Sequence, residues 1–220
     1  MPNAPPDDVL IELLDEYAPF KPAPLCPEVS VFQGRSLVEV WEAAERVAGE
    51  HLPAPFWAYP WAAGCALARV LLDSPAYVRD RRVLEMGAGG GIVSLAAAHA
   101  GARYVTANDV DPWAVATARI AAVRQQLQIQ VLLADLTKQP AAVDAFEVLL
   151  CSDMAYERRM TPKYGALLQR AKNRGMQVLV ADAGRTYFDP TGLRLLTQYE
   201  LEVPRDLEGV DMRTARVFEF

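Results

Sequence analysis

Hydrophobic and polar positions follow a helical period in two stretches near the start of the chain. One covers residues 8–17, and the other is "SLVEVWEAAERVAGE", where Ser36 is placed to cap the helix and Glu39 stands at the capping-box position. The Pro-spaced stretch "APFKPAPLCPE" between them indicates extended chain. We therefore expect residues 1–55 to form an accessory segment that packs on the core and is not a separate domain.

From residue 56 onward, strand-like and helical patterns alternate. Short apolar runs bounded by turn residues indicate buried strands, and longer stretches with apolar residues three and four apart indicate helices. This alternation is typical of a doubly wound parallel sheet, in which ligands bind at the carboxyl ends of the strands. The predicted strands cover 82–86, 104–108, 130–134, 146–151 and 176–181, and the predicted helices cover 63–73, 92–100, 112–126 and 161–173.

The two last strand-like runs, "LTQYELEVP" and "MRTARVFEF", have no helical pattern between them. Without a helix, the chain lacks the crossover that joins two parallel neighbours, so we expect an antiparallel strand in this edge region. The sequence therefore predicts an α/β fold over residues 56–220. We expect a doubly wound, seven-strand, Rossmann-like methyltransferase sheet with an antiparallel C-terminal strand.

Composition narrows the functions that this fold could carry. The 220 residues are 52% apolar, which suffices for one sizeable core, and the net charge of −6 disfavours a nucleic-acid partner because its phosphates would be repelled. The first residues lack the basic and apolar regions of a signal peptide, and no run of about 18 apolar residues occurs. Cys26, Cys65 and Cys151 stand far apart, which is typical of a reducing compartment and unlike a metal site. We expect a cytoplasmic monomer without a membrane segment or a metal.

The stretch "VLEMGAGGGIVSLAAA" joins a predicted strand to a predicted helix through Gly87, Gly89 and Gly91. A dinucleotide site needs a further glycine at the position of Ile92, so that fingerprint fails. Glu85, two residues before the first glycine, would repel a pyrophosphate but favours a ligand that carries an ammonium group. S-adenosylmethionine is such a ligand, since it has an amino acid head, a sulfonium cation and no phosphate. The glycines would let the backbone approach its methionine part, and the helix N-terminus would offer N–H groups to its carboxylate.

Two further acids follow the next two predicted strands. Asp109 is placed to accept hydrogen bonds from both ribose hydroxyls, and Asp135 is placed to accept one from the adenine amino group. With Glu85, these acids outline the whole of S-adenosylmethionine at three successive strand ends. The aromatic residues that could line the mouth of the site are Trp57, Tyr59 and Trp61.

Several motifs carry a resemblance to a known family, over about residue 28 to the C-terminus. Besides the glycine loop they are "PFWAYPWAAGCALARVLLD", "ANDVDPWA", "SDMAYE", "ADAGRTYF" and "DMRTARVFEF". Together they resemble the lysine methyltransferases that act on the beta subunit of electron transfer flavoprotein, within a group marked by a D-x-x-Y motif after the fourth strand. The family usually has Asp at the position of Glu85, Gly-Gln at 64–65 and G-D-P-G-R at 181–185.

This resemblance implies a protein-lysine N-methyltransferase that uses S-adenosylmethionine and acts on the electron transfer flavoprotein beta subunit. It assigns Asp153 and Tyr156 of the D-x-x-Y motif to catalysis and places Trp61 near the cofactor. Asp153 would attract and orient the lysine ammonium, and Tyr156 would form a wall beside the amine, while a role of Asp153 as base stays open. A basic, lysine-bearing loop is the expected substrate, because the protein is acidic and Asp153 and Glu157 would stand at the mouth.

Alternatives remain at this point. The same cofactor site could serve a small-molecule amine N-methyltransferase, in line with the nicotinamide label that bacterial relatives often carry, or a non-catalytic cofactor-binding protein. Arg185 is equally open, because it could pair with an acidic partner surface or form an internal ion pair.

Overall fold

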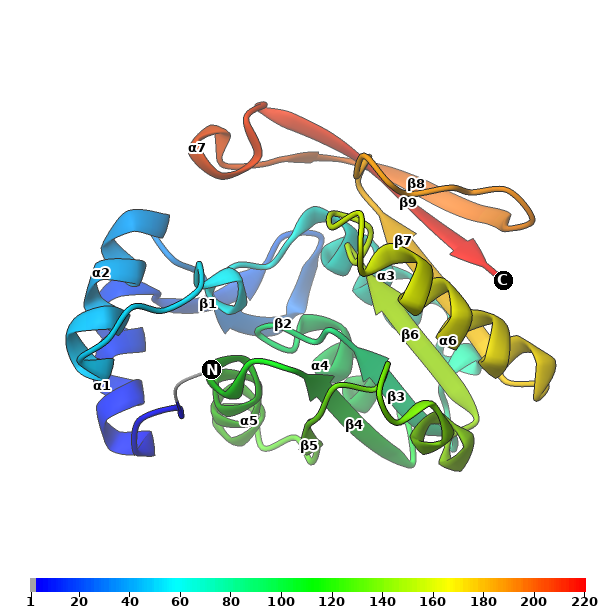
Figure 1. Ribbon diagram of the computed structural model, residues 1–220, viewed down its shortest axis with the longest axis horizontal. Coiled ribbons are helices and arrows are strands. Elements are labelled where there is room, and N and C mark those ends of the chain that lie inside the picture. Colours follow the sequence, from blue (N-terminus) through cyan, green and yellow to red (C-terminus); the bar gives the residue numbers. More distant parts are fainter. Residues whose placement is uncertain (1–2) are drawn as a thin grey trace.

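The computed structural model describes residues 3–220, which form a twisted sheet with helices on both faces (Figure 1). Within this range the sheet has seven strands in the order β5-β4-β3-β6-β7-β9-β8, and β9 runs antiparallel to both of its neighbours. The predicted antiparallel C-terminal strand is therefore confirmed, and it is inserted between β7 and β8. The strands are β3 (Arg82–Met86), β4 (Tyr104–Asp109), β5 (Gln130–Leu133), β6 (Val148–Ser152), β7 (Gln177–Asp182), β8 (Arg194–Glu202) and β9 (Met212–Glu219).

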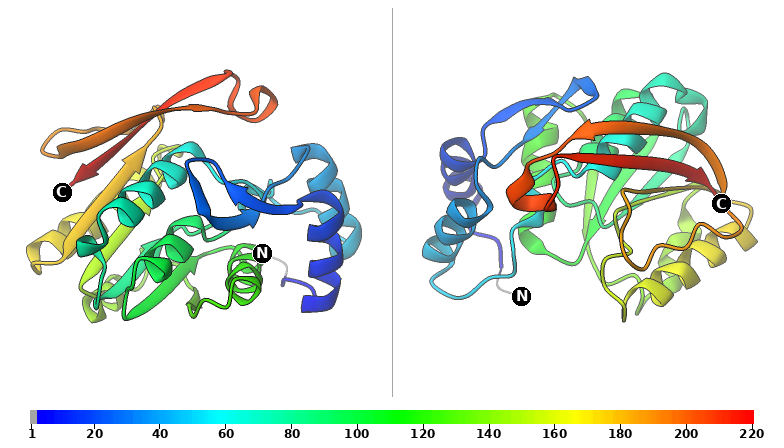
Figure 2. Two further views of the ribbon diagram at one scale, coloured as in Figure 1. Left: turned by 180° about the vertical axis from the view of Figure 1, so that it is seen from behind. Right: turned by 90° about the horizontal axis from the view of Figure 1, so that it is seen from above.

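Helices α3, α4 and α5 cover one face of the sheet and α6 covers the other, as the views from the front and from behind show (Figures 1 and 2). Successive strand residues divide between the two layers: Val83 and Leu150 pack with α3, α4 and α5, whereas Leu84 and Leu149 pack with α6. Burial on both faces explains the nearly continuous apolar runs of these strands. The helices are α3 (Ala62–Asp73), α4 (Ile92–His99), α5 (Pro112–Arg124) and α6 (Thr161–Asn173), with 3-10 turns η1 (Phe56–Ala58), η2 (Pro75–Tyr77) and η3 (Pro140–Ala145).

None of the helices within residues 3–220 is long and apolar enough to cross a membrane.

The chain before the sheet forms two helices and a hairpin. Ser36 caps the second helix as predicted, since its hydroxyl oxygen accepts the N–H of Glu39 at 3.4 Å. The stretch predicted only as extended chain is an antiparallel hairpin, and it tolerates Pro22 because the first strand pairs on one side only. These elements are α1 (Asp7–Tyr17), β1 (Phe20–Ala23), β2 (Cys26–Phe32) and α2 (Leu37–Ala48).

This N-terminal part shares its core with the sheet domain. Leu10, Leu14 and Phe32 are almost completely buried in the same apolar cluster as residues of α4 and α5. The side chain of Gln125, just after α5, accepts the N–H of Ser30 at 2.8 Å and donates to its carbonyl at 2.9 Å, which fixes the hairpin against the domain. The boundary at residue 55 stays a prediction.

A single helical turn, α7 (Arg205–Glu208), lies between β8 and β9, where the sequence predicted no helix. It follows Pro204 and ends at Gly209, which has a left-handed φ of +70°. A helix of four residues is too short to show a 3.6-residue period, which is why the pattern did not indicate it. The turn places Glu208 in the interior, with 8% of its surface exposed.

Candidate active site

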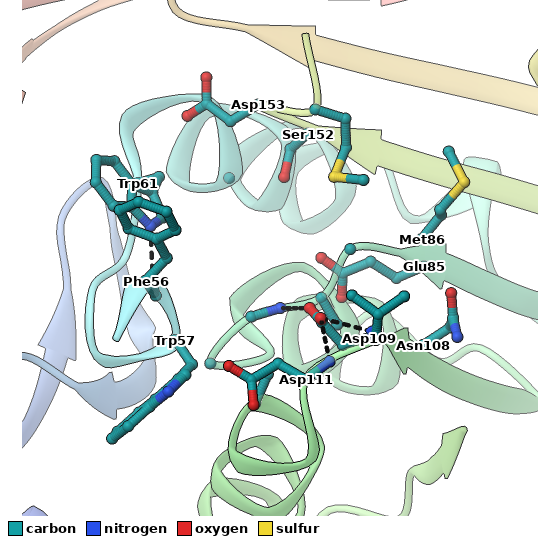
Figure 3. A pocket seen from close by; sticks show the side chains of 18 of the residues that line it. Phe56, Trp57, Trp61, Glu85, Met86, Asn108, Asp109, Asp111, Ser152 and Asp153 are labelled. Atoms are coloured by element: carbon teal, nitrogen blue, oxygen red, sulfur yellow. Dashed lines mark hydrogen bonds between the residues drawn. The ribbon is translucent and has the colours of Figure 1, made fainter. Parts of the chain in front are cut away.

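A cavity of about 600 Å³ lies at the carboxyl ends of β3, β4 and β6 (Figure 3). The loop between β3 and α4, the η1 segment and the end of β2 all contribute to its lining. Of the residues predicted for the site, Gly91 alone is absent from the lining among residues 3–220; it precedes α4 and packs against Ala118 of α5. The predicted residues that line the cavity are Trp61, Glu85, Gly87, Gly89, Asp109, Asp135, Asp153 and Tyr156.

The loop between β3 and α4 needs glycine where other parts of the chain approach it. A Cβ on Gly90 would lie 2.5 Å from the carbonyl oxygen of Trp57, and a Cβ on Gly87 would overlap the sulfur of Met154. Gly87 also has a left-handed φ of +71°. This role of Gly90 could not be predicted from the sequence, because nothing in the local spacing reveals that η1 packs on this loop.

Glu85 is almost completely buried at the end of β3, and its carboxyl faces the cavity (Figure 3). Its Oε2 accepts the backbone N–H of Ser94 at 2.8 Å and the Ser94 hydroxyl at 2.5 Å. Burial raises the pKa of Glu85 to about 8, although the hydrogen bonds from Ser94 act in the opposite direction. A cationic group in the cavity would therefore favour ionisation of this acid.

Asp109, at the end of β4, holds the glycine loop. Its Oδ2 accepts the N–H of Gly89 at 2.9 Å, and its Oδ1 accepts the N–H groups of Val110 and Asp111 at 2.7 and 3.0 Å (Figure 3). Burial raises the pKa of Asp109, and these three backbone bonds oppose the rise. The acid thus faces the cavity in an orientation fixed by the backbone.

Asp135, in the loop after β5, is held by its own neighbours. Its Oδ1 accepts the Thr137 hydroxyl at 2.6 Å and the Thr137 N–H at 3.0 Å, and its Oδ2 pairs with Lys138 at 3.2 Å. The hydrogen bond from the Thr137 side chain, more than any other contact, lowers the pKa of Asp135. Asn108, which the sequence analysis missed, donates to the carbonyls of Leu132 and Ala134 at 2.9 and 2.8 Å and so fixes this loop against β4.

From the sequence we expected Asp153 at an open mouth, but in the structure this side chain is buried. It is 8% exposed, and its Oδ1 accepts the Nε–H of Arg185 at 2.9 Å. Arg185 therefore forms an internal ion pair, which decides between its two possible roles. Burial raises the pKa of Asp153, and the charge of Arg185 opposes that rise. Asp153 Oδ2 is buried and makes no well-formed hydrogen bond among residues 3–220, although the backbone N–H of Ala63 lies close enough to this carboxyl to lower its pKa.

Aromatic residues surround the mouth beside Asp153. Trp61 donates its indole N–H to the carbonyl of Phe56 at 2.9 Å, and the Tyr156 ring lies 6.2 Å from the Phe56 ring, centre to centre. Phe56 and Tyr156 are 46% and 52% exposed, so this rim reaches the surface. Trp57, by contrast, is buried and stacks on Trp113 at 5.7 Å. Trp57, Tyr59 and Trp61, which were predicted for the mouth, all line the cavity, but Trp57 and Tyr59 are buried, so the rim itself is formed by Trp61, Phe56 and Tyr156.

Comparisons with known proteins place this geometry in a family. Residues 83–185 match the model of a methyltransferase domain. The electron transfer flavoprotein beta subunit lysine methyltransferase of Danio rerio is 31% identical over 197 residues, which cover 86% of this chain and 72% of that protein. The protein of the same name from Mus musculus is 32% identical over 172 residues, covering 76% and 67%. The chain belongs to this lysine methyltransferase family.

The fold agrees with this assignment. Magnesium protoporphyrin IX methyltransferase from Synechocystis PCC 6803, solved with bound S-adenosylmethionine, superposes with a TM-score of 0.51 at 14% identity, over 71% of this chain and 77% of that one. S-adenosylmethionine is the cofactor of this N-methyltransferase. Where the lysine methyltransferase family usually has Gln, the buried Cys65 donates its thiol to the carbonyl of Pro60 at 3.4 Å, so this departure lies behind the cavity wall.

Proposed function

We propose that this enzyme methylates lysine side chains of the electron transfer flavoprotein beta subunit. One observation carries the proposal: the partly exposed rings of Phe56 and Tyr156 surround a mouth that leads to the buried carboxylate of Asp153. A lysine side chain suits this mouth, because its methylene groups can pack on the rings while its ammonium reaches the acid. The relatives from Danio rerio and Mus musculus are named for this substrate.

The other end of the cavity suits S-adenosylmethionine. Among the described residues that line the cavity, the one basic side chain is Arg185, which is paired with Asp153, so a phosphate-bearing ligand would find no free cation. We assign Glu85 to the ammonium of the cofactor, Asp109 to the ribose and Asp135 to the adenine amino group. The glycine loop would lie along the methionine part, with Trp61 at its edge. When bound, the cofactor supplies an electrophilic methyl group on a sulfonium sulfur.

The residues of this chain then have to bind and orient a neutral amine and keep water away from it. A free lysine has a pKa of about 10.4 and is neutral about once in 2,500 at pH 7, which costs roughly 5 kcal/mol. We assign Asp153, through its Oδ2, to the incoming nitrogen and Tyr156 to covering it from the mouth. Both roles concern position, which is the main protein contribution when the cofactor supplies the electrophile.

Mass spectrometry of the methylated subunit tests this function. Purified enzyme is incubated with S-adenosylmethionine and the purified electron transfer flavoprotein beta subunit, and peptides are then analysed. We expect methyl-lysine with the native enzyme and little or none with Asp153→Asn. A parallel reaction contains nicotinamide in place of the subunit. Methylated nicotinamide without any methyl-lysine would contradict the proposal and support the small-amine alternative.

A further inference from the structure

Four charged side chains form a network of ion pairs beside the substrate mouth. Asp153 pairs with Arg185, Arg185 donates to Glu208 of α7 at 3.1 Å, and Glu208 accepts from Arg213 of β9 at 3.1 Å. The exposed fractions of these side chains run from 3% for Glu208 to 25% for Arg213. Two acids and two arginines sum to zero charge, so the group stays buried without an uncompensated ion.

The turn after β7 is built to present Arg185. Asp182 Oδ1 accepts the N–H groups of Gly184 and Arg185 at 2.7 and 2.9 Å, and Gly184 has a left-handed φ of +86°. The Arg185 guanidinium lies 5.3 Å from the centre of the Trp61 ring, on the aromatic rim. The "ADAGR" motif therefore fixes a cation between the buried acid and the substrate mouth.

The two carboxylate oxygens of Asp153 therefore have different surroundings. Oδ1 is held by Arg185, while Oδ2 is buried and makes no well-formed hydrogen bond in the described part of the chain. Asp153, Trp61 and Arg185 all line the cavity. A nitrogen that enters through the rim would approach an acid whose Oδ1 is already engaged by Arg185 and whose charge is already balanced.

We propose that Arg185 is a positioning residue that fixes Asp153 and balances its charge, so that a bound lysine amine loses its proton at a lower pH than it would beside an unpaired carboxylate. This inference rests on the proposed function. An unpaired carboxylate within about 4 Å would raise the pKa of an ammonium and keep it protonated, whereas a neutral ion pair still accepts the hydrogen bond and raises the pKa much less. The proton goes to water at the mouth, and the amine keeps the electron pair.

The thiols and the phenol near this pair add no charge to it, and Asp182 is the further acid that faces it. Burial raises the pKa values of the Cys65 and Cys151 thiols and of the Tyr156 hydroxyl, so these groups are neutral over the working range. Burial also raises the pKa of Asp182, whose Oδ1 is engaged by the turn. The ionisable side chains near Asp153 and Arg185 are those of Glu208, Arg213, Asp182, Tyr156, Cys65 and Cys151.

The pH dependence of kcat/KM tests the inference. For Arg185→Gln we expect the rise in activity with pH to move to higher pH by about one unit or more, with S-adenosylhomocysteine affinity changed by less than about twofold. Arg185→Lys keeps the charge but cannot bridge Asp153 and Glu208 as the guanidinium does, so its profile should lie between those of the native enzyme and Arg185→Gln. A loss of rate that is equal at every pH, with no shift, would show a purely structural role and overturn the inference.

Glu208→Gln provides a second test, in which the pH profile should shift in the opposite direction. It removes a negative charge from the far side of Arg185, so the guanidinium acts more strongly on the amine and the profile should move to lower pH. An alkaline shift in this variant would contradict the inference even if Arg185→Gln does not fold. If the native enzyme methylates only a small amine, the proposed protein substrate is wrong. The role of Arg185 is then tested by measuring the same pH profiles with that amine. If the native enzyme methylates no amine at all, both proposals fail.

Discussion

Glu85 has one oxygen bound by Ser94 and a carboxyl that faces the cavity from the end of β3 (Figure 3). Because burial raises its pKa to about 8, the acid binds a proton near neutral pH when no cation is present. In our assignment the cofactor ammonium binds the ionised form. Cofactor binding near pH 7 should therefore release a proton.

We expect the affinity for S-adenosylmethionine to rise between about pH 5.5 and 7, by up to about tenfold per unit, because the fraction of ionised Glu85 rises as pH approaches its raised pKa. Calorimetry across this range measures it. Asp111 lines the same cavity, and burial raises its pKa to about 6, so a comparison is needed. Glu85→Gln keeps an acceptor for Ser94 and should remove the steep dependence; an equally steep rise in that variant would assign it to another group.

The glycine loop between β3 and α4 packs closely against the backbone of η1. Gly90→Ala would place a methyl group 2.5 Å from the carbonyl oxygen of Trp57, which is backbone and has little room to move. We expect this variant to lose about 1 to 3 kcal/mol of unfolding free energy and to bind the cofactor more weakly. Urea unfolding and calorimetry measure the two effects.

Gly165, in the middle of α6, provides the matched control. It is exposed, and a Cβ there meets nothing within 4 Å among the described residues. Alanine has the higher helix propensity, so Gly165→Ala should stabilise the protein by about 0.5 to 1 kcal/mol and leave cofactor affinity unchanged. If both alanine variants destabilised the protein equally, close packing at Gly90 would not be the cause.

At the element scale, prediction worked where a repeating pattern existed. Strand β3 and helix α6 were predicted with the bounds that the structure has, because each is a well-defined apolar run or helical period between turn residues. The hairpin of β1 and β2 and the turn α7 were not predicted. Prolines hide the strand pattern around Pro22, and a four-residue helix has no period to detect.

The residues of the site likewise fall into those that the sequence could predict and those that it could not. The acids Glu85 and Asp109 could be predicted because strand order alone brings their positions together at one edge of the sheet. The hydrogen-bond partners of these two acids could not be predicted from the sequence. The burial of Asp153 beside Arg185 could not be predicted either. Glu208, which completes that group, depends on α7 and on the way the β8–β9 hairpin folds back, and no local spacing reports such long-range packing.

For the molecule as a whole, the net charge of −6 bears on how a substrate approaches. A lysine-bearing surface that is basic would be attracted over a distance set by the ionic strength. We expect kcat/KM for the protein substrate to fall several-fold between about 50 and 300 mM salt, mainly through a higher KM. Initial rates at several salt concentrations measure this, with S-adenosylhomocysteine affinity as the control. A rate independent of salt would mean that charge does not steer the encounter.

The central claim for the whole molecule is that one cavity has two separate halves, one for the cofactor and one for the amine. The most direct test is the affinity of Asp153→Asn for S-adenosylhomocysteine, measured by calorimetry beside Asp109→Ala. We predict that Asp153→Asn, while losing methyl transfer, binds within about twofold of the native enzyme, whereas Asp109→Ala loses about 1.5 to 3 kcal/mol of binding free energy. An equal loss of affinity in Asp153→Asn would place Asp153 in the cofactor half and contradict the claim.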